Sequence, residues 1–236
     1  MYKRQLLKEL EPNWDITLFE RLDRVGAESS NAWNNAGTGH SALCELNYAP
    51  MGSDGTVNPA KALNINEQFQ TSRQFWSTLV EEGKIANPSF INSVPHMSLV
   101  FGKDHSEYLK TRYQSLSAQK LFEKMEFSQD PEKIAEWAPL TMEGRDPKET
   151  VAANYSREGT DVDFGNLALQ FTHHLEEQGA DVRFGHEVQD LRQESDGSWS
   201  LRVTNRLNAE DDLLVRAKFV FLGAGGGALP LLQKSG

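Results

Sequence analysis

The least regular part of the chain, residues 27–41, has the residue types of a loop that wraps a polar ligand. It reads AESSNAWNNAGTGHS and shows neither the period of a strand nor that of a helix. It is dense in Ser, Asn, Thr and Gly, whereas an ordinary surface turn rarely needs so many small hydrogen-bonding groups. We therefore expect this segment to bind an extended, polar molecule.

An acidic residue follows a predicted strand near the amino end. Residues 6–10 resemble the end of an amphipathic helix, and residues 15–20 alternate toward a short buried strand. Helix, turn, strand and acid is the order in the second half of a βαβ dinucleotide unit, where the acid accepts hydrogen bonds from a ribose hydroxyl. Glu20 is that acid, with a solvated strand end as the alternative. The first strand of such a unit and its glycines are missing.

A glycine-rich turn lies near the other end. Residues 218–222 are predicted to form a strand, and residues 229–233 to begin a helix. Between them, Gly223, Gly225 and Ala228 match the G-x-G-x-x-G/A spacing. Glycines allow a pyrophosphate to approach the backbone closely. Glycine turns after strands are also common, so the pattern alone leaves both interpretations open.

The remaining elements indicate a mixed α/β chain. Apolar residues at helical spacing predict several helices, and an Asp196-Gly197 turn between two alternating runs predicts a β-hairpin. The segment between about Asn58 and Ala153 is more helical than its flanks. The predicted helices cover residues 64–82 and 108–125, a short one starts at Asp130-Pro131, and another is capped by Asp163 and ends at Gly179.

Composition excludes several function classes. With 24 Lys and Arg against 34 Asp and Glu, the formal net charge of −10 argues against a nucleic-acid partner. The single cysteine, Cys44, excludes an internal disulfide. No apolar run reaches the roughly 18 residues of a spanning helix, which leaves peripheral membrane contact open. We expect no metal site, because the adjacent His173 and His174 would point about 100° apart on a helix and are interpreted as solvated.

The motifs occur in the same order in one known family. These sequence motifs are ERLD at 20–23, the loop at 27–41, VPHMS at 94–98, MEGRDP at 142–147, GTDVDFG at 159–165 and FVFLGAGGGALP at 219–230. On these residues the chain closely resembles malate:quinone oxidoreductase, nearly end to end and truncated at both ends.

This resemblance implies an α/β fold with an α+β insert, namely a partial glutathione-reductase-like FAD-binding Rossmann domain with an inserted substrate domain. The expected divisions are 1–57 for the first FAD-binding part, 58–160 for the insert, and 161–236 for the second FAD-binding part. The implied activity is FAD-dependent oxidation of (S)-malate to oxaloacetate, with electrons passed to a membrane quinone. Family members are cytoplasmic or peripheral on the cytoplasmic face of the bacterial inner membrane.

The resemblance also implies a set of FAD-binding residues. Glu20, with Arg21 beside it, would meet the adenosine ribose, and the backbone of Val188 would meet the adenine. A hairpin core valine is the alternative for Val188. The residues along the pyrophosphate, ribityl chain and flavin would be Ser29, Ser30, Asn34, Asn35, Ala36, Gly37 and Thr38, with Gly223, Ala224, Gly225 and Gly226 opposite them.

Malate oxidation requires a base for the substrate hydroxyl and cations for two carboxylates. Histidine suits the base because its ordinary pKa lies near neutrality. His40 and His96 are the candidates, each with an ordinary hydrogen-bonded histidine as the alternative. Arg145 can clamp a carboxylate with two hydrogen bonds, and a surface ion pair is its alternative.

Two other functions stay open at this point. One is a flavin-dependent oxidase of another 2-hydroxy acid such as 2-hydroxyglutarate. The other is an incomplete, non-catalytic nucleotide-binding module.

Overall fold

The computed structural model describes residues 7–208 and 212–235, which form two compact units. Unit 1 contains the described residues up to Ala36 and from Asp163 onward, and unit 2 contains residues 37–162. The chain therefore leaves unit 1, builds unit 2 and returns. Unit 2 begins at residue 37, whereas the expected insert begins at residue 58. Segment 37–57 belongs to unit 2 because its apolar side chains are buried in that unit's core, as Ala42 and Val57 show.

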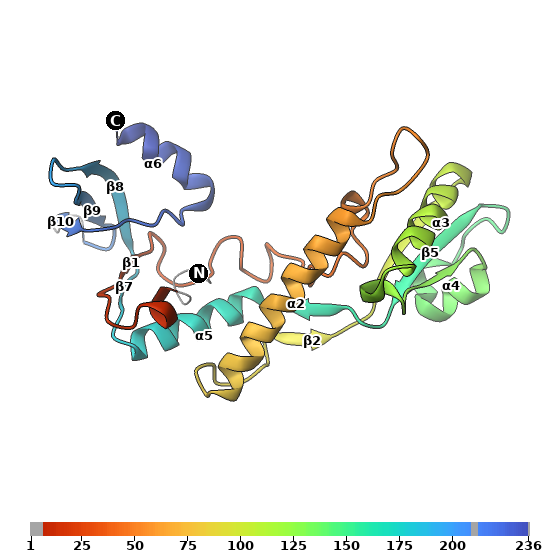
Figure 1. Cartoon of the computed structure of the whole chain (residues 1–236), viewed down its shortest axis with the longest axis horizontal. Coiled ribbons are helices and arrows are strands. Elements are labelled where there is room, and N and C mark those ends of the chain that lie inside the picture. Colours follow the sequence, from red (N-terminus) through yellow and green to blue (C-terminus); the bar gives the residue numbers. More distant parts are fainter. Residues whose placement is uncertain (1–6, 209–211, 236) are drawn as a thin grey trace. The chain divides into compact units, whose positions relative to one another are not determined.

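Unit 1 contains a small parallel sheet. Strand β1 (Thr17–Phe19) pairs in parallel with β7 (Asp181–Arg183), and helix α5 (Phe164–Glu177) leads into β7 (Figure 1). The side chain of Asp163 caps α5 by accepting from the backbone N–H of Asn166, and Gly179 follows the helix with φ +80°. The predicted cap and stop of this helix are confirmed. Residues 7–10 are helical, while residue 6 of the predicted amino-terminal helix lies outside the described residues.

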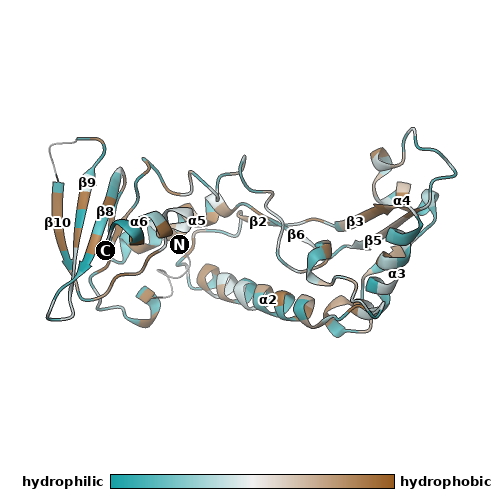
Figure 2. Ribbon diagram, turned by 90° about the horizontal axis from the view of Figure 1, so that it is seen from above, coloured by the Kyte–Doolittle hydropathy of each residue, from teal (hydrophilic) through white to brown (hydrophobic). Residues whose placement is uncertain are grey.

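A three-stranded antiparallel sheet forms the second part of unit 1. Its order is β10-β9-β8, with β8 at His186–Gln193, β9 at Trp199–Asn205 and β10 at Asp212–Ala217. The predicted hairpin is thus confirmed, and β10 is a further strand that the sequence pattern did not predict. Hydropathy alternates along these strands (Figure 2), as expected for a sheet with one buried face. Leu191, Leu201 and Val203 form the core of that face.

The segment after β10 does not form the predicted strand. Residues 218–222 pair as a strand with none of the described residues, so the prediction at this position is wrong. Alternation alone does not make a strand, because the backbone also needs a ladder partner. Val220 and Leu222 instead pack on the cluster of the β8-β9-β10 sheet, while Phe219 is exposed. The helix expected after the glycines is present as a 3-10 turn, η4 (Gly225–Gly227), followed by α6 (Ala228–Lys234).

Unit 2 is built on a long helix and two small sheets. Helix α2 (Ala60–Glu81) matches the prediction, but the predicted helix over 108–125 is split into α3 (Lys103–Ser117) and a 3-10 turn. Asp130 caps the short helix α4 as expected. The other elements are η1 (Leu46–Tyr48), β2 (Ile91–Ser93), β3 (His96–Phe101), η2 (Lys120–Phe122), β4 (Glu126–Ser128), α4 (Pro131–Trp137), η3 (Pro139–Thr141), β5 (Val151–Ser156) and β6 (Thr160–Val162).

The sheet of order β3-β5-β4 separates two cores in unit 2. On one face, Ala152 and Val100 pack with Leu109 of α3. On the other, Val151 and Ala153 pack with the α4 side chain Ile134. Because alternate residues share a face, His96 and Ser98 lie on the same face as Val100, the side that α3 covers. Their strand partners on β5, Ser156 and Asn154, lie beside them on that face. A row of polar side chains therefore lies beneath the loop that follows His40.

Within the ranges that the structure describes, no helix is both long enough and apolar enough to cross a bilayer.

Candidate functional site

Glu20 lies where β1, β7 and β8 meet. Its backbone N–H donates to the carbonyl of Arg183 over 3.0 Å, and its carbonyl accepts from the N–H of His186 over 2.9 Å. The carboxylate Oε1 accepts from the N–H of Leu22 over 3.0 Å. The local backbone therefore fixes this carboxylate at the end of a parallel strand, where a ribose-binding acid is expected.

One hydrophobic cluster joins three regions that are far apart in the sequence. Phe19, directly before Glu20, packs in the same cluster as Val188 of β8 and Leu222, directly before Gly223. The predicted adenine contact, Val188, thus belongs to this cluster, and the ribose acid and the start of the glycine turn each directly follow a member of it. At the glycine turn, Gly225 has φ +51° and nothing lies within 4 Å of a Cβ built on it or on Gly226. This edge of the backbone is open for a ligand to approach.

The unit 1 part of the predicted ligand loop folds back on itself. The side-chain amide of Asn34 donates to the carbonyl of Glu28, and that of Asn35 donates to the carbonyl of Ser29, each over 3.0 Å. The hydroxyls of Ser29 and Ser30 have no hydrogen-bond partner among the described residues. The loop conformation is thus held by its amides, which leaves hydroxyls for a ligand.

Two further contacts place this loop within unit 1. Arg21 pairs with the carboxylate of Glu28. A Cβ on Gly165, in the first turn of α5, would come within 3.1 Å of the carbonyl of Ser30, so glycine permits the loop to approach that helix. Ala36 is exposed and is the last residue of the loop in unit 1.

Gly37 and Thr38 belong to unit 2, where they line up beside β6. Thr38 forms an isolated bridge with Asp161, and the carbonyl of Gly37 accepts from the N–H of Val162 over 2.6 Å. Gly37 has φ +69°, and a Cβ there would stand 2.3 Å from the carboxylate of Asp161. The backbone at Gly37 therefore requires glycine for its own packing, whatever ligand it meets.

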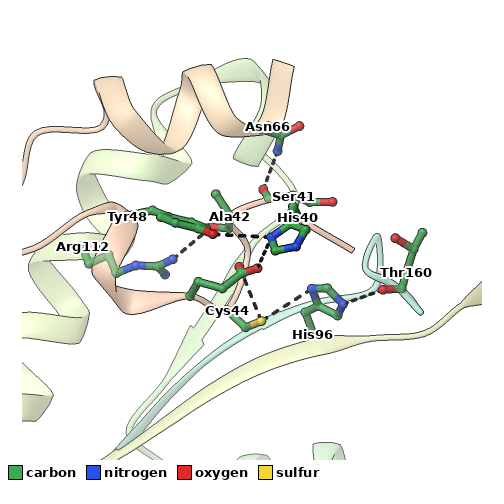
Figure 3. Close-up of polar contacts among 10 residues, drawn as sticks. His40, Ser41, Ala42, Cys44, Tyr48, Asn66, His96, Arg112 and Thr160 are labelled. Atoms are coloured by element: carbon green, nitrogen blue, oxygen red, sulfur yellow. Dashed lines mark hydrogen bonds and ion pairs between the residues drawn. The ribbon is translucent and has the colours of Figure 1, made fainter. Parts of the chain in front are cut away.

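His40 begins a segment that we call the histidine loop, residues 40–49. Its Nδ1 lies 3.4 Å from the hydroxyl of Tyr48 and 4.0 Å from Oε1 of Glu45 (Figure 3). That Glu45 oxygen is buried and makes no hydrogen bond within the described residues. Nε2 of His40 has no partner there either, and the side chain is 57% exposed. The ring therefore has one nitrogen facing polar side chains and one available to a substrate.

His96 is buried, and both of its ring nitrogens have partners. Nε2 lies 3.0 Å from the carbonyl oxygen of Thr160, and Nδ1 lies 3.7 Å from the Sγ of Cys44. Burial, reinforced by neighbouring Glu45, raises the pKa of the Cys44 thiol to about 11, so the thiol stays protonated near neutral pH. The thiol has one proton and two acceptors at 3.7 Å, Oε2 of Glu45 and Nδ1 of His96, while Nε2–H of His96 can donate to the Thr160 carbonyl. Both nitrogens of the buried His96 ring therefore face groups of the fold, and this geometry favours a structural role.

Arg145 is also engaged within the fold. Its Nε donates to the carbonyl of Thr141 over 2.5 Å, and Nη1 pairs with Glu149 at 3.0 Å. The guanidinium lies 3.8 Å from the centre of the Phe101 ring. Arg145 thus forms the ion pair that was the alternative to a role in substrate binding. A carboxylate of malate would have to displace Glu149 to bind the guanidinium.

Two other arginines of unit 2 line a cavity of about 870 Å³. Arg73 and Arg157 make no ion pair with any residue that the structure describes. The buried hydroxyls of Ser41 and Thr160, which belong to residues of the cavity lining, also have no hydrogen-bond partner there. Residue type alone did not single out these groups, because their availability depends on where neighbouring acids lie.

The predicted interpretation of the histidine pair in α5 holds for only one member. His173 is exposed, as expected, but His174 is buried with 4% of its surface accessible. Its Nε2 lies 3.3 Å from the carboxylate of Glu9, so the interpretation of His174 as solvated is wrong. The two residues differ because one step along a helix turns a side chain by about 100°. No group of three or more potential metal ligands occurs within the described ranges.

Comparison with known proteins identifies the family. The sequence model described as malate:quinone oxidoreductase (Mqo) matches residues 4–236. The chain belongs to the malate:quinone oxidoreductase family. The probable malate:quinone oxidoreductase of Neisseria gonorrhoeae is 63% identical over 231 residues, which are 98% of this chain and 47% of that protein. The probable malate:quinone oxidoreductase of Kocuria rhizophila is 59% identical with the same coverage. The chain thus spans about half the length of these family members.

Solved structures show that this member of the malate:quinone oxidoreductase family shares a fold with two oxidases and a dehydrogenase. Glycine oxidase from Geobacillus kaustophilus has a TM-score of 0.69 at 18% identity, covering 98% of this chain and 53% of that one. L-proline dehydrogenase from P. horikoshii has a TM-score of 0.62 at 17% identity, covering 98% and 52%. L-alpha-glycerophosphate oxidase from Mycoplasma pneumoniae, solved with FAD bound, has a TM-score of 0.57 at 13% identity, covering 88% and 48%. The expected α/β fold class is confirmed.

Proposed function

We propose that the chain is the part of an FAD-dependent malate:quinone oxidoreductase that oxidises (S)-malate to oxaloacetate and passes the electrons to a membrane quinone. Membership of the family supports the activity. The single structural observation that carries the proposal is the shared cluster of Phe19, Val188 and Leu222, since it gathers the ribose acid, the adenine contact and the glycine turn in unit 1. We also propose that membrane contact is peripheral.

The residues of unit 1 fit FAD. A carboxylate fixed at a strand end suits a ribose hydroxyl, and an open glycine backbone at Gly225 and Gly226 suits a pyrophosphate. The free hydroxyls of Ser29 and Ser30 add donors for the polar part of the ligand. Arg21, Asn34, Asn35 and Ala36 stay proposed contacts through the same loop, as do Gly37 and Thr38 from unit 2 and Ala224 between the glycines.

When bound, FAD would supply the acceptor for the hydride that leaves the carbinol carbon of malate. His40 would take the hydroxyl proton at Nε2, the nitrogen that faces no described residue. The resulting imidazolium would then donate from Nδ1 toward the buried, unbonded oxygen of Glu45, now 4.0 Å away. Catalytic hydrogen bonds are often long before substrate binds, so a small closure would complete this pair. Tyr48 would orient the ring from the same side.

The two carboxylates of malate need cations, and the ion pairs of unit 2 decide which arginines are available. Arg145 was the sequence-based choice, but Glu149 already pairs with it. Arg73 and Arg157 line the unit 2 cavity without an ion-pair partner in residues 7–208 and 212–235, and we propose them as the more accessible carboxylate ligands. Guanidinium groups suit this task because they bind a carboxylate with two parallel hydrogen bonds.

A substrate panel tests the function. The coding sequence would be expressed at the length of its relatives, loaded with FAD, and assayed for quinone reduction with (S)-malate, (R)-malate, 2-hydroxyglutarate and lactate. We expect reduction with (S)-malate to exceed that with the other acids. A preference for 2-hydroxyglutarate would instead establish the other oxidase, and no reduction by a flavin-loaded protein would reject both activities.

A further inference from the structure

The backbone of the histidine loop is held by side chains from three separate elements of unit 2. Apart from the short turn η1, this loop contains no regular structure of its own. Its carbonyls nevertheless accept a series of side-chain hydrogen bonds. The donors are Asn66 of α2 to Ser41 (2.8 Å), Arg112 of α3 to Ala42 (3.1 Å) and Leu43 (3.3 Å), Ser98 of β3 to Cys44 (2.8 Å), and Tyr108 of α3 to Leu46 (3.0 Å) and Ala49 (2.9 Å).

Among these donors, Arg112 is the side chain whose burial is least favourable for folding. Its side chain is completely buried, and its Nε and Nη1 make no hydrogen bond within the described residues. It forms no ion pair there, although Glu45 lies within electrostatic range. A buried guanidinium with unmade hydrogen bonds is unfavourable for folding, so stability alone is a poor reason for an arginine at this position. The two hydrogen bonds that it does make run from Nη2 to the carbonyls of Ala42 and Leu43, and they indicate that its role is to hold the loop backbone.

Those two bonds meet the loop at its strained point. Ala42 has φ +56° and is the only residue other than glycine with a positive φ in the described part of the chain. A left-handed conformation is unfavourable for a residue with a Cβ and persists only when its surroundings hold it. Ala42 is fully buried, and Nη2 of Arg112 bonds its carbonyl (Figure 3).

The path of the backbone through Ala42 decides where the polar partners of His40 lie. His40 precedes the strained residue, whereas Glu45 and Tyr48 follow it. The distances from Nδ1 of His40 to Oε1 of Glu45 and to the Tyr48 hydroxyl, 4.0 and 3.4 Å, therefore depend on the turn at Ala42 and Leu43. We infer that Arg112 is a positioning residue, whose guanidinium holds the turn that sets Glu45 and Tyr48 against Nδ1 of His40. Its catalytic consequence rests on the proposed function, but its geometric consequence does not.

The geometric consequence is tested on the 236-residue chain without cofactor. The readout is the nuclear Overhauser effect between the rings of His40 and Tyr48, measured with labelled His and Tyr, and circular dichroism reports folding. Arg112→Met is expected to lose this signal, whereas Arg112→Lys, whose ammonium can still donate to the two carbonyls, is expected to keep most of it. Lys110→Met removes the same charge from the exposed face of α3 and is expected to behave as the original chain.

An unchanged ring-to-ring signal in folded Arg112→Met would overturn the inference, as would equal loss in Lys110→Met. If Arg112→Met does not fold, Arg112→Gln replaces it, because the shorter neutral side chain also fails to hold both carbonyls. Loss of the signal in folded Arg112→Gln would support the inference, and retention would overturn it.

The catalytic consequence is tested in the flavin-loaded, full-length enzyme. Arg112→Met is expected to lower kcat by about tenfold or more, with a change in the KM for malate of less than about twofold. Adding it to His40→Ala is expected to cost nothing further, because the arginine acts through the histidine. A full additional loss in the double variant would contradict the inference. If His40→Ala alone is fully active, the proposed base is wrong, while the ring-to-ring signal still decides the role of Arg112.

Discussion

Cys44 and His96 lie 3.7 Å apart, Sγ to Nδ1, in the buried polar layer between the histidine loop and strand β3. The pair superficially resembles a nucleophile with its base. Here the two groups are not a reactive pair, because burial keeps the Cys44 thiol protonated and Nε2 of His96 is hydrogen-bonded to the carbonyl of Thr160. His96 therefore supports the loop from below, and His40 is the histidine of this region with an available nitrogen.

The two histidines are expected to respond differently to substitution. In the full-length, flavin-loaded enzyme, His40→Ala should lower kcat by about 10²- to 10⁴-fold, the usual contribution of a general base, with little change in stability. His96→Ala should destabilise unit 2 by about 1–3 kcal/mol, since it removes a buried ring and one of the two hydrogen bonds that the Thr160 carbonyl accepts, the other coming from the N–H of Gly39. The variant should keep most activity in the folded fraction. Urea unfolding and steady-state kinetics on both variants separate these effects. A larger catalytic loss from His96→Ala than from His40→Ala would contradict the assignment.

Gly37 is expected to tolerate no side chain. Gly37→Ala adds a Cβ that would stand 2.3 Å from the exposed Asp161 carboxylate, which can rotate, and 3.0 Å from the backbone carbonyl oxygen of Val162, which cannot, so steric overlap is added to the strain of φ +69°. The matched control is Gly55→Ala, which has φ +75° but nothing within 4 Å of its Cβ. Strain alone costs about 1–2 kcal/mol. Thermal unfolding should show a clearly larger loss for Gly37→Ala, and equal losses would refute the close approach to β6.

Cys44 is expected to make the stability of unit 2 fall at alkaline pH. Burial, followed by the charge of Glu45, raises the pKa of the folded thiol from 9.0 to about 11. The folded state thus favours the protonated thiol, so this contribution is complete below pH 9 and is lost as the pH rises from about 9 to 11. Urea unfolding across this range should show the decrease, and Cys44→Ser should remove much of it. An identical alkaline profile for the two proteins would contradict the burial of the thiol.

Local signals in the sequence explain which parts of the fold could be predicted. Helix α5 was predictable because its cap, apolar face and glycine stop all lie within the helix or beside it. The hairpin β8-β9 was predictable for the same reason, since Asp196 and Gly197 form its turn. Strands β3 and β5 were not, because they pair with each other across 50 to 60 residues of sequence, as Ser98 does with Asn154. Residues 218–222 have the alternation of a strand but lack a ladder partner among the described residues.

Some features of the candidate site could likewise be predicted from the sequence, and others could not. Residue type and order identified the loop at 27–41, Glu20, the glycine turn and His40. Exposure and partners could not be predicted, because they arise from packing between distant segments. Nothing local distinguishes Arg112, which is buried beneath the histidine loop, from Lys110 on the same helix, which is exposed. Likewise, only the folded structure shows that Arg145 is paired while Arg157 has no ion-pair partner among the residues that the structure describes.

The central claim, that Glu20 and the glycine turn of unit 1 hold FAD, is tested most directly by titrating the flavin-free original chain, expressed at the length of its relatives, with FAD and following flavin fluorescence. Glu20→Gln and Glu176→Gln make the same charge change, but Glu176 lies exposed on α5. The account predicts saturable binding of FAD by the original chain and by Glu176→Gln, with affinity reduced about tenfold or more in Glu20→Gln, as for a lost hydrogen bond to a charged group. Equal FAD affinity in all three proteins, or no binding by the original chain, would contradict it.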